Sequence, residues 1–167
     1  ICETCQSAEA TFNCVTCAGD HGWCHPCLIR SHQSLPFHKI QLWNSICFQD
    51  VALADQGFIW YLGHGGEPCP SHGASKIYGN QDERVDDVTE TGSLPYNTTP
   101  VTIVHSSGVF TYNVSCCHCP GSNPHHLELL RVQLFPASST QPETAFTFDV
   151  LDHCLIDALE CKTLARS

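Results

Sequence analysis

The sequence contains no methionine, and only 7 of its 167 residues are lysine or arginine, against 17 aspartates and glutamates. The formal net charge of −10 disfavours non-specific binding to nucleic acids, because phosphate backbones repel a negative surface. No apolar run approaches the roughly 18 residues that a membrane-spanning helix needs, so no membrane span is expected. Because the negative charge disfavours nucleic acids, it favours a protein partner. Since Met is missing and the chain begins at Ile1, we also expect it to be part of a longer protein.

Motifs of the common catalytic classes are missing as well. The sequence has no glycine-rich phosphate loop, no GxSxG elbow and no HxE…PCxxC deaminase signature. An acidic run at residues 81–90 could offer carboxylates to a two-metal nuclease, but we interpret it as part of a solvated loop at about 81–100. The sequence therefore predicts a protein without catalytic activity and without a small-molecule substrate.

Cysteine and histidine, by contrast, are abundant and regularly spaced. Eight zinc-ligand types follow one another as Cys2-x2-Cys5-x8-Cys14-x2-Cys17-x6-Cys24-x2-Cys27-x4-His32-x5-His38. Each CxxC turn can hold two sulfurs at roughly 2.3 Å from a common point, which is half of a tetrahedral site. Eight ligands make two complete sites, and a complete site leaves no position for water or substrate. The pattern predicts two structural zinc ions.

Two pairings of these ligands are possible. In a cross-braced arrangement, pairs one and three (Cys2, Cys5, Cys24 and Cys27) share one zinc, and pairs two and four (Cys14, Cys17, His32 and His38) share the other. A sequential arrangement would instead join Cys2, Cys5, Cys14 and Cys17. We favour the cross-brace. Three nearby side chains could replace one of these ligands, namely Asp20, His21 and His25.

Thirteen cysteines and sequons at Asn97 and Asn113 would also suit a secreted, disulfide-rich protein. The odd cysteine count, the three CxxC pairs and the spaced histidines argue for reduced, zinc-bound cysteine instead. Since disulfides are rare inside cells, this interpretation predicts an intracellular protein.

A second, weaker cluster of ligand types lies farther along the chain. Cys117 and Cys119 form a CxC turn, and His64-x4-Cys69 is a possible partner half-site, so these four residues predict a third zinc. The alternative is free buried cysteine beside exposed histidine. Spare candidates are His72, Cys116, His125 and His126. The isolated Cys47, Cys154 and Cys161 are expected to be small core residues.

The remaining pattern predicts a zinc-rich α+β fold. A cross-braced module at 1–44, with a short helix from Cys24 to His32, precedes an α+β portion at 45–167. The apolar stretch at 45–65 should pack on the core. Val101–His105 and Val109–Ser115 flank Ser-Ser-Gly and predict a β-hairpin. We expect a strand over 127–136, ended by Pro136, and then a capping box, Thr140-x-x-Glu143, that opens a C-terminal helix containing Phe148, Leu151, Leu155, Ala158 and Leu159.

The first 43 residues resemble a B-box-like zinc finger, although the gap between Cys17 and Cys24 is longer than expected there. The run from Cys14 to Asn44 is similar to the cysteine-rich cluster that accompanies Kyakuja-Dileera-Zisupton (KDZ) transposases in fungi. The matching pieces are CxxCxxxxxxCxxCxxxxH, HKIQLWN at 38–44, LGHGGEPCP at 62–70, the CxC turn, and LELLRVQLFPASSTQPETAFTFDVLD at 127–152, where the family shows a pattern like QLL…WFPAT…P.TAFTF.VL. Leu134-Phe135 departs from the expected Trp-Phe.

This resemblance implies an accessory, zinc-bearing module of a transposase-like protein in the nucleus. It does not imply strand transfer, because the acidic catalytic triad is expected in another part of such proteins. We predict a scaffold that binds a protein partner or a second copy of itself, as B-box domains do. One alternative is a DNA-recognition module for transposon ends, acting through a localised basic face. Another is a zinc-dependent hydrolase, which would need an open metal position at the third site.

Overall fold

A computed structural model describes residues 1–71 and 98–161 of this chain, and it contains two β-sheets and three α-helices in those ranges. The mixed α+β class expected from the sequence is confirmed. The acidic run at 81–90 and the loop expected around it, up to residue 97, lie outside the described residues, as does His72. The end of that expected loop is wrong, because Thr99 and Pro100 already belong to a strand. None of the helices in the described part is long and apolar enough to cross a membrane.

The N-terminal part is built on a three-stranded antiparallel sheet in the order β1-β2-β3. Its strands are β1 (Phe12–Cys14), β2 (Ile40–Trp43) and β3 (Phe48–Val51), so the sheet extends beyond residue 44. Between β1 and β2 lies the short helix α1 (His25–Ser31), as the sequence predicts. Pro26 stands in its first turn, where a missing backbone N–H costs nothing.

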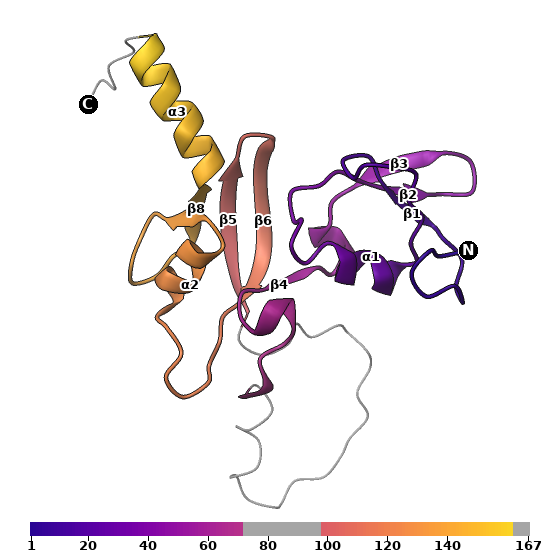
Figure 1. Ribbon diagram of the computed structural model, residues 1–167, viewed down its shortest axis with the longest axis horizontal. Helices are drawn as coiled ribbons and strands as arrows, with labels where there is room; N and C mark the ends of the chain where they lie inside the picture. The colour runs from indigo at the N-terminus through magenta and orange to yellow at the C-terminus, as the bar shows by residue number, and fades with distance from the viewer. Residues whose placement is uncertain (72–97, 162–167) are drawn as a thin grey trace, which may run out of the picture.

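The second sheet has five strands in the order β4-β6-β5-β8-β7. They are β4 (Ile59–Tyr61), β5 (Thr99–His105), β6 (Gly108–Ser115), β7 (Leu134–Pro136) and β8 (Thr144–Thr147). The predicted hairpin is confirmed as β5 and β6, with His105 paired to Gly108 at the turn. Figure 1 shows this hairpin between the N-terminal part and the elements at the C-terminal end. Short 3₁₀ turns at Ala54–Gln56 and His64–Gly66 flank β4.

Two predictions for the C-terminal part are wrong in detail. The residues expected to begin a strand at 127 form helix α2 (His125–Arg131), and the strand starts only at Leu134, after a left-handed residue at Gln133 (φ 62°). Alternating leucines suit either structure over so few residues. In the helix, Leu129 is buried whereas Leu127 is 40% exposed.

The C-terminal helix exists, but it begins later than predicted. Helix α3 (Phe148–Glu160) is capped by Thr147, whose Oγ1 accepts a hydrogen bond from the backbone N–H of Val150 at 3.3 Å. Thr140-x-x-Glu143 is therefore not its capping box. The intervening residues Thr144–Thr147 are β-branched or apolar and join the sheet as β8, in parallel with β5.

One continuous hydrophobic core joins the two sheets. It includes Phe12, Leu28 and Ile40 from the N-terminal part, and Trp60, Ile103 and Leu134 from the second sheet. Within the apolar stretch at 45–65, Leu53, Phe58 and Trp60 are buried, as predicted, whereas Ile46 is 84% exposed.

The prediction that the isolated cysteines are core residues is wrong, because Cys47, Cys154 and Cys161 are all exposed. Cys47 lies in the turn between β2 and β3, and Cys154 lies on α3, which has no fully buried residue. Position in a surface element decides exposure here, whatever the polarity of the side chain.

A buried hydrogen bond fixes the N-terminal part against the second sheet. The hydroxyl of Tyr112, on β6, donates to the carbonyl oxygen of Pro36 at 2.5 Å, and the Tyr112 side chain is 3% exposed. Beside it, the ring of Phe37 stacks on His105 with 4.3 Å between the ring centroids. The two parts therefore pack through specific polar and aromatic contacts.

We predict that Tyr112→Phe lowers the free energy of unfolding by about 1–3 kcal/mol, because it leaves the Pro36 carbonyl buried without its donor. Chemical denaturation monitored by circular dichroism measures this change. Tyr61→Phe is the matched control, since the Tyr61 hydroxyl makes no side-chain hydrogen bond within the described ranges. Equal losses in the two variants would contradict the prediction.

Candidate metal centres

Three groups of four side chains bring their ligand atoms within 4.8 Å of one another in the described residues. Each group contains only cysteine and histidine. They are Cys2, Cys5, Cys24 and Cys27; Cys14, Cys17, His32 and His38; and His64, Cys69, Cys117 and Cys119. The first two groups follow the alternating order of a cross-brace, and the structure does not bring Cys14 and Cys17 into the group of Cys2 and Cys5.

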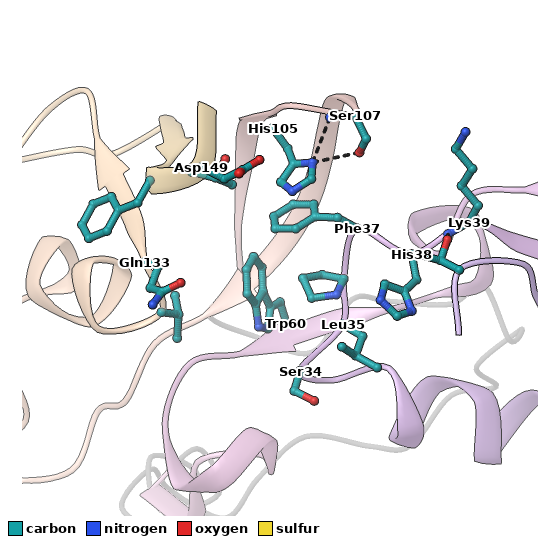
Figure 2. Close-up of a pocket in the computed structure, with 15 residues that line it drawn as sticks. Ser34, Leu35, Phe37, His38, Lys39, Trp60, His105, Ser107, Gln133 and Asp149 are labelled. Carbon is teal, nitrogen blue, oxygen red and sulfur yellow. Dashed lines mark hydrogen bonds between the residues drawn. The ribbon is translucent and has the colours of Figure 1, made fainter. Parts of the chain in front are cut away.

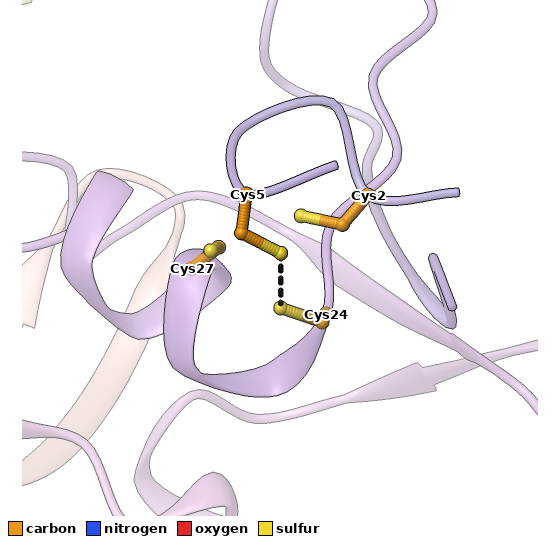
Figure 3. A group of neighbouring side chains, drawn as sticks. All are labelled: Cys2, Cys5, Cys24 and Cys27. Carbon is orange, nitrogen blue, oxygen red and sulfur yellow. Dashed lines mark hydrogen bonds between the residues drawn. The ribbon is translucent and has the colours of Figure 1, made fainter. Parts of the chain in front are cut away.

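The first group joins the N-terminal loop to the start of α1 (Figure 3). Cys2 and Cys5 lie in the loop, Cys24 is the residue before the helix, and Cys27 lies in its first turn. The sulfurs of Cys5 and Cys24 are 3.7 Å apart. Hydrogen bonding from the side chain of Ser7 lowers the pKa of Cys5 to about 6, whereas hydrogen bonding with Cys24 raises the pKa of Cys27 to about 12. Four thiolates so close together repel one another, and a divalent cation bound between them would offset that repulsion.

The second group uses Cys14 at the end of β1, Cys17 just after that strand, and two histidines between α1 and β2. Nδ1 of His32 lies 3.0 Å from the carbonyl oxygen of Leu28, so this nitrogen carries the proton and Nε2 is left to face Cys17 at 3.7 Å. His38 faces the sulfurs through Nδ1, whereas His32 uses Nε2. This Nδ1 lies 3.5 Å from the sulfur of Cys14 and 3.3 Å from that of Cys17. Burial lowers the pKa of both histidines, which favours the neutral form that binds metals.

The third group lies where β4 and β6 end. Nε2 of His64 is 3.3 Å from the sulfur of Cys117 and 3.6 Å from that of Cys119, and the sulfurs of Cys69 and Cys119 are 3.7 Å apart. Because β4 and β6 are parallel neighbours, their carboxyl ends bring residues about 50 positions apart to the same edge of the sheet. A side chain at Gly63 would come within 3.2 Å of the Cys117 Cβ, so glycine permits this close approach.

These separations are those of a tetrahedral metal site. With Zn–S near 2.3 Å and Zn–N near 2.05 Å, the edges of such a tetrahedron are about 3.8 Å between sulfurs and about 3.6 Å between sulfur and nitrogen. A disulfide would instead place its sulfurs about 2.05 Å apart. All thirteen cysteines are free. The donor sets therefore fit metal ions, and cysteine with neutral imidazole is the combination that zinc prefers.

The neighbouring candidates do not join these groups. Both ring nitrogens of His21 contact oxygen acceptors, on Glu3 at 2.9 Å and on Ala18 at 2.8 Å, and His25 contacts the carbonyl of Gln56. Asp20, His125 and His126 are absent from every metal-binding group of the described residues. Burial raises the pKa of Cys116 to about 12, which keeps it a neutral thiol beside Cys117.

The comparisons with known proteins bear on the third group. Residues 87–167 match the family model of the CxC2-like cysteine cluster associated with KDZ transposases. The resemblance to KDZ-associated clusters is thereby confirmed for residues 87–167. The CxC2 match contains Cys117 and Cys119, whereas the first two groups, His64 and Cys69 precede it. No curated protein matches the chain, and no solved structure does.

A buried carboxylate supports the CxC turn of Cys117 and Cys119 from outside the metal group. Glu128, on α2, is 5% exposed, and its Oε2 accepts a hydrogen bond from the backbone N–H of Cys117 at 2.8 Å. Sequence reasoning missed this residue, because the run around it was interpreted as a strand. No local signal separates such an acid from a surface glutamate; only its burial reveals the role.

We predict that Glu128→Ala weakens metal binding at the third group by about 10- to 100-fold, the usual effect of removing a partner that orients a ligand, because alanine offers no acceptor to the Cys117 N–H. Competition against a chromogenic chelator measures this affinity. The control is Glu143→Ala, which changes an exposed glutamate in the matched region 87–167. Unchanged metal affinity in Glu128→Ala would show that the carboxylate does not position Cys117.

Proposed function

We propose that this chain is a zinc-organised, non-catalytic accessory module of a KDZ-transposase-like protein, and that it mediates protein association in the nucleus. The observation that carries the structural role is the completeness of all three donor sets. Each set in the described residues has four protein ligands, so a bound zinc has no open position for water or substrate. Each set also joins segments distant in sequence, as a structural metal does.

Helix α3 supports the role in protein association. Phe148, Leu151, Leu155 and Leu159 recur at helical spacing, and Leu155 and Leu159 are 57% and 71% exposed. Figure 1 shows α3 extending away from the body of the molecule. Exposed apolar stripes of this kind mark surfaces that other proteins cover.

The charge distribution supports a protein partner over DNA. In the described part of the chain the lysines and arginines are Arg30, Lys39 and Arg131, and Arg30 already lies 3.9 Å from Glu67. Within residues 1–71 and 98–161, three cations form no basic face that follows a phosphate backbone, and the net charge of the chain is −10. Specific retention of transposon-end DNA at physiological salt would reverse this ranking.

The association role is tested with the zinc-loaded chain. Sedimentation of the purified chain should detect self-association, and crosslinking in cells should detect a defined partner. The double substitution Leu155→Glu with Leu159→Glu should abolish the association. His153→Glu is the control, because it adds negative charge on the polar side of the same helix. A chain that stays monomeric and captures no partner would refute the association role while leaving the metal sites intact.

A further inference from the structure

A cleft of about 520 Å³ lies at the junction of the N-terminal part and the second sheet. Its walls come from Ser34–Lys39 on one side, from the β5–β6 turn on another, and from the start of α3. Figure 2 shows Phe37 and Trp60 in the middle, with Lys39 and His38 on one side and Asp149 on the other. This volume lies in the range of about 300–1,000 Å³ that is typical of ligand sites.

The apolar floor of the cleft is formed before any ligand arrives. Phe37 packs on His105 and edge-on to Trp60, with 5.8 Å between the centroids of Phe37 and Trp60. The bond from Tyr112 to the Pro36 carbonyl fixes the chain immediately before Phe37. Phe148 adds a partly exposed aromatic ring at the opposite wall. A bound apolar side chain would therefore meet a rigid aromatic surface.

One polar group in the wall has no protein acceptor in the described ranges. His38 turns Nδ1 toward the second metal group, so its Nε2–H is on the opposite edge of a ring that lines the cleft. Metal-ligating histidines almost always donate this second N–H to a carboxylate, a carbonyl or water. His32 in the same group donates to Leu28, whereas nothing within residues 1–71 and 98–161 hydrogen bonds to Nε2 of His38.

The residue beside it adds a positive charge. Lys39 is exposed, and its ammonium group forms no ion pair with the described residues. Its backbone is held by a bond from Lys39 N–H to Thr16 Oγ1 at 3.0 Å. Lys39 therefore lies on the same side of the cleft as His38, although its side chain extends away from the imidazole in Figure 2. Because the lysine stem is flexible, the ammonium can reach a carboxylate that accepts a hydrogen bond from His38.

We propose that this cleft binds a short segment of a partner protein that carries a leucine-like side chain next to an aspartate or glutamate. The carboxylate accepts from His38 and Lys39, and the apolar side chain lies on Phe37, Trp60 and Phe148. Asp149, across the cleft, repels a second acid and so sets the direction of the segment. The overall negative charge acts over longer distances and is screened beyond a Debye length of about 8 Å at physiological salt. This inference rests on the proposed role in protein association.

The experiment uses the zinc-loaded chain and amidated, N-acetylated hexapeptides that pair leucine with glutamate, glutamine or lysine. Isothermal titration should show that the glutamate peptide binds at least about tenfold more tightly than the other two, because only it accepts charge-assisted hydrogen bonds. Lys39→Gln should remove that preference without changing the zinc content. Arg30→Gln is the control, because it removes an equally exposed cation that does not line the cleft.

Two further measurements separate the parts of the proposal. Glutamate peptide should shift the His38 Nε2–H resonance in NMR spectra, which a merely structural role of His38 would not produce. Phe148→Ser should lower the affinity for the glutamate peptide and for the glutamine peptide by the same factor. Equal affinity for these two peptides, or no peptide binding by zinc-loaded chain, would overturn the inference. If α3-dependent association persists in Lys39→Gln while the peptides fail to bind, the cleft proposal alone is refuted.

Discussion

Replacing Cys24 with serine should unfold the N-terminal part of the chain and release its metal. Cys24 is 9% exposed, and its sulfur lies 3.7 Å from that of Cys5 and completes the group that joins the N-terminal loop to α1. Structural zinc contributes about 10–16 kcal/mol in small modules at neutral pH, which is comparable with the roughly 5–15 kcal/mol that stabilises a whole domain. A short helix and three short strands cannot replace that contribution. His32→Ala should act in the same way at the second group.

Zinc content by elemental analysis and dispersion of the amide NMR signals measure this outcome. The matched control is Cys154→Ser, which makes the same chemical change at an exposed position of α3 that belongs to no metal group. It should change the free energy of unfolding by less than about 0.5 kcal/mol. If Cys24→Ser keeps its full zinc content and a folded N-terminal sheet, the first group is not a structural metal site.

Replacing Cys117 with serine should lower the zinc content from about three ions per chain to two, with the N-terminal part still folded. Cys117 provides a sulfur at 3.3 Å from Nε2 of His64, and the group it completes joins the end of β6 to the 3₁₀ turn after β4. Serine supplies no thiolate, so three ligands would remain and affinity would fall steeply. The loss should loosen the connection around β4 and leave the cross-brace intact, because the groups share no ligand.

The adjacent Cys116→Ser provides the control. Cys116 has the same chemistry one position away, but it is outside the metal group and burial keeps its thiol neutral. The Cys116→Ser variant should keep three zinc ions, and its free energy of unfolding should fall by about 1 kcal/mol. A wild-type content of two zinc ions would rule out the third site.

Much of the ligand arrangement was predictable from the sequence because its geometry is local. A CxxC turn holds its two sulfurs close together in any fold, so spacing alone indicates half-sites. The alternation of four half-sites then predicts the groups that the structure brings together. Even the long-range partnership of His64 and Cys69 with Cys117 and Cys119 followed from the composition of the two half-sites.

Other features could not be predicted, because local patterns there are ambiguous. The residues from Leu127 to Val132 alternate well enough for a strand and repeat well enough for a helix, and packing of Leu129 and Glu128 decides for the helix. The exposure of Cys154 depends on how α3 projects from the sheet. Thr144–Thr147 joins β5 and β7, and only that pairing places the start of α3 at Phe148.

The donor sets, the negative charge and the KDZ-type cluster could be recognised before any folding was considered, since they depend on residue identity and on spacings of a few positions. The tertiary structure alone decided what surrounds the donors. Glu128 supports Cys117, and the ring of His38 lines the cleft beside Phe37 and Trp60. Each of these contacts joins segments that only the packing of the two sheets brings together, and burial, which sets their chemistry, is a property of the folded chain.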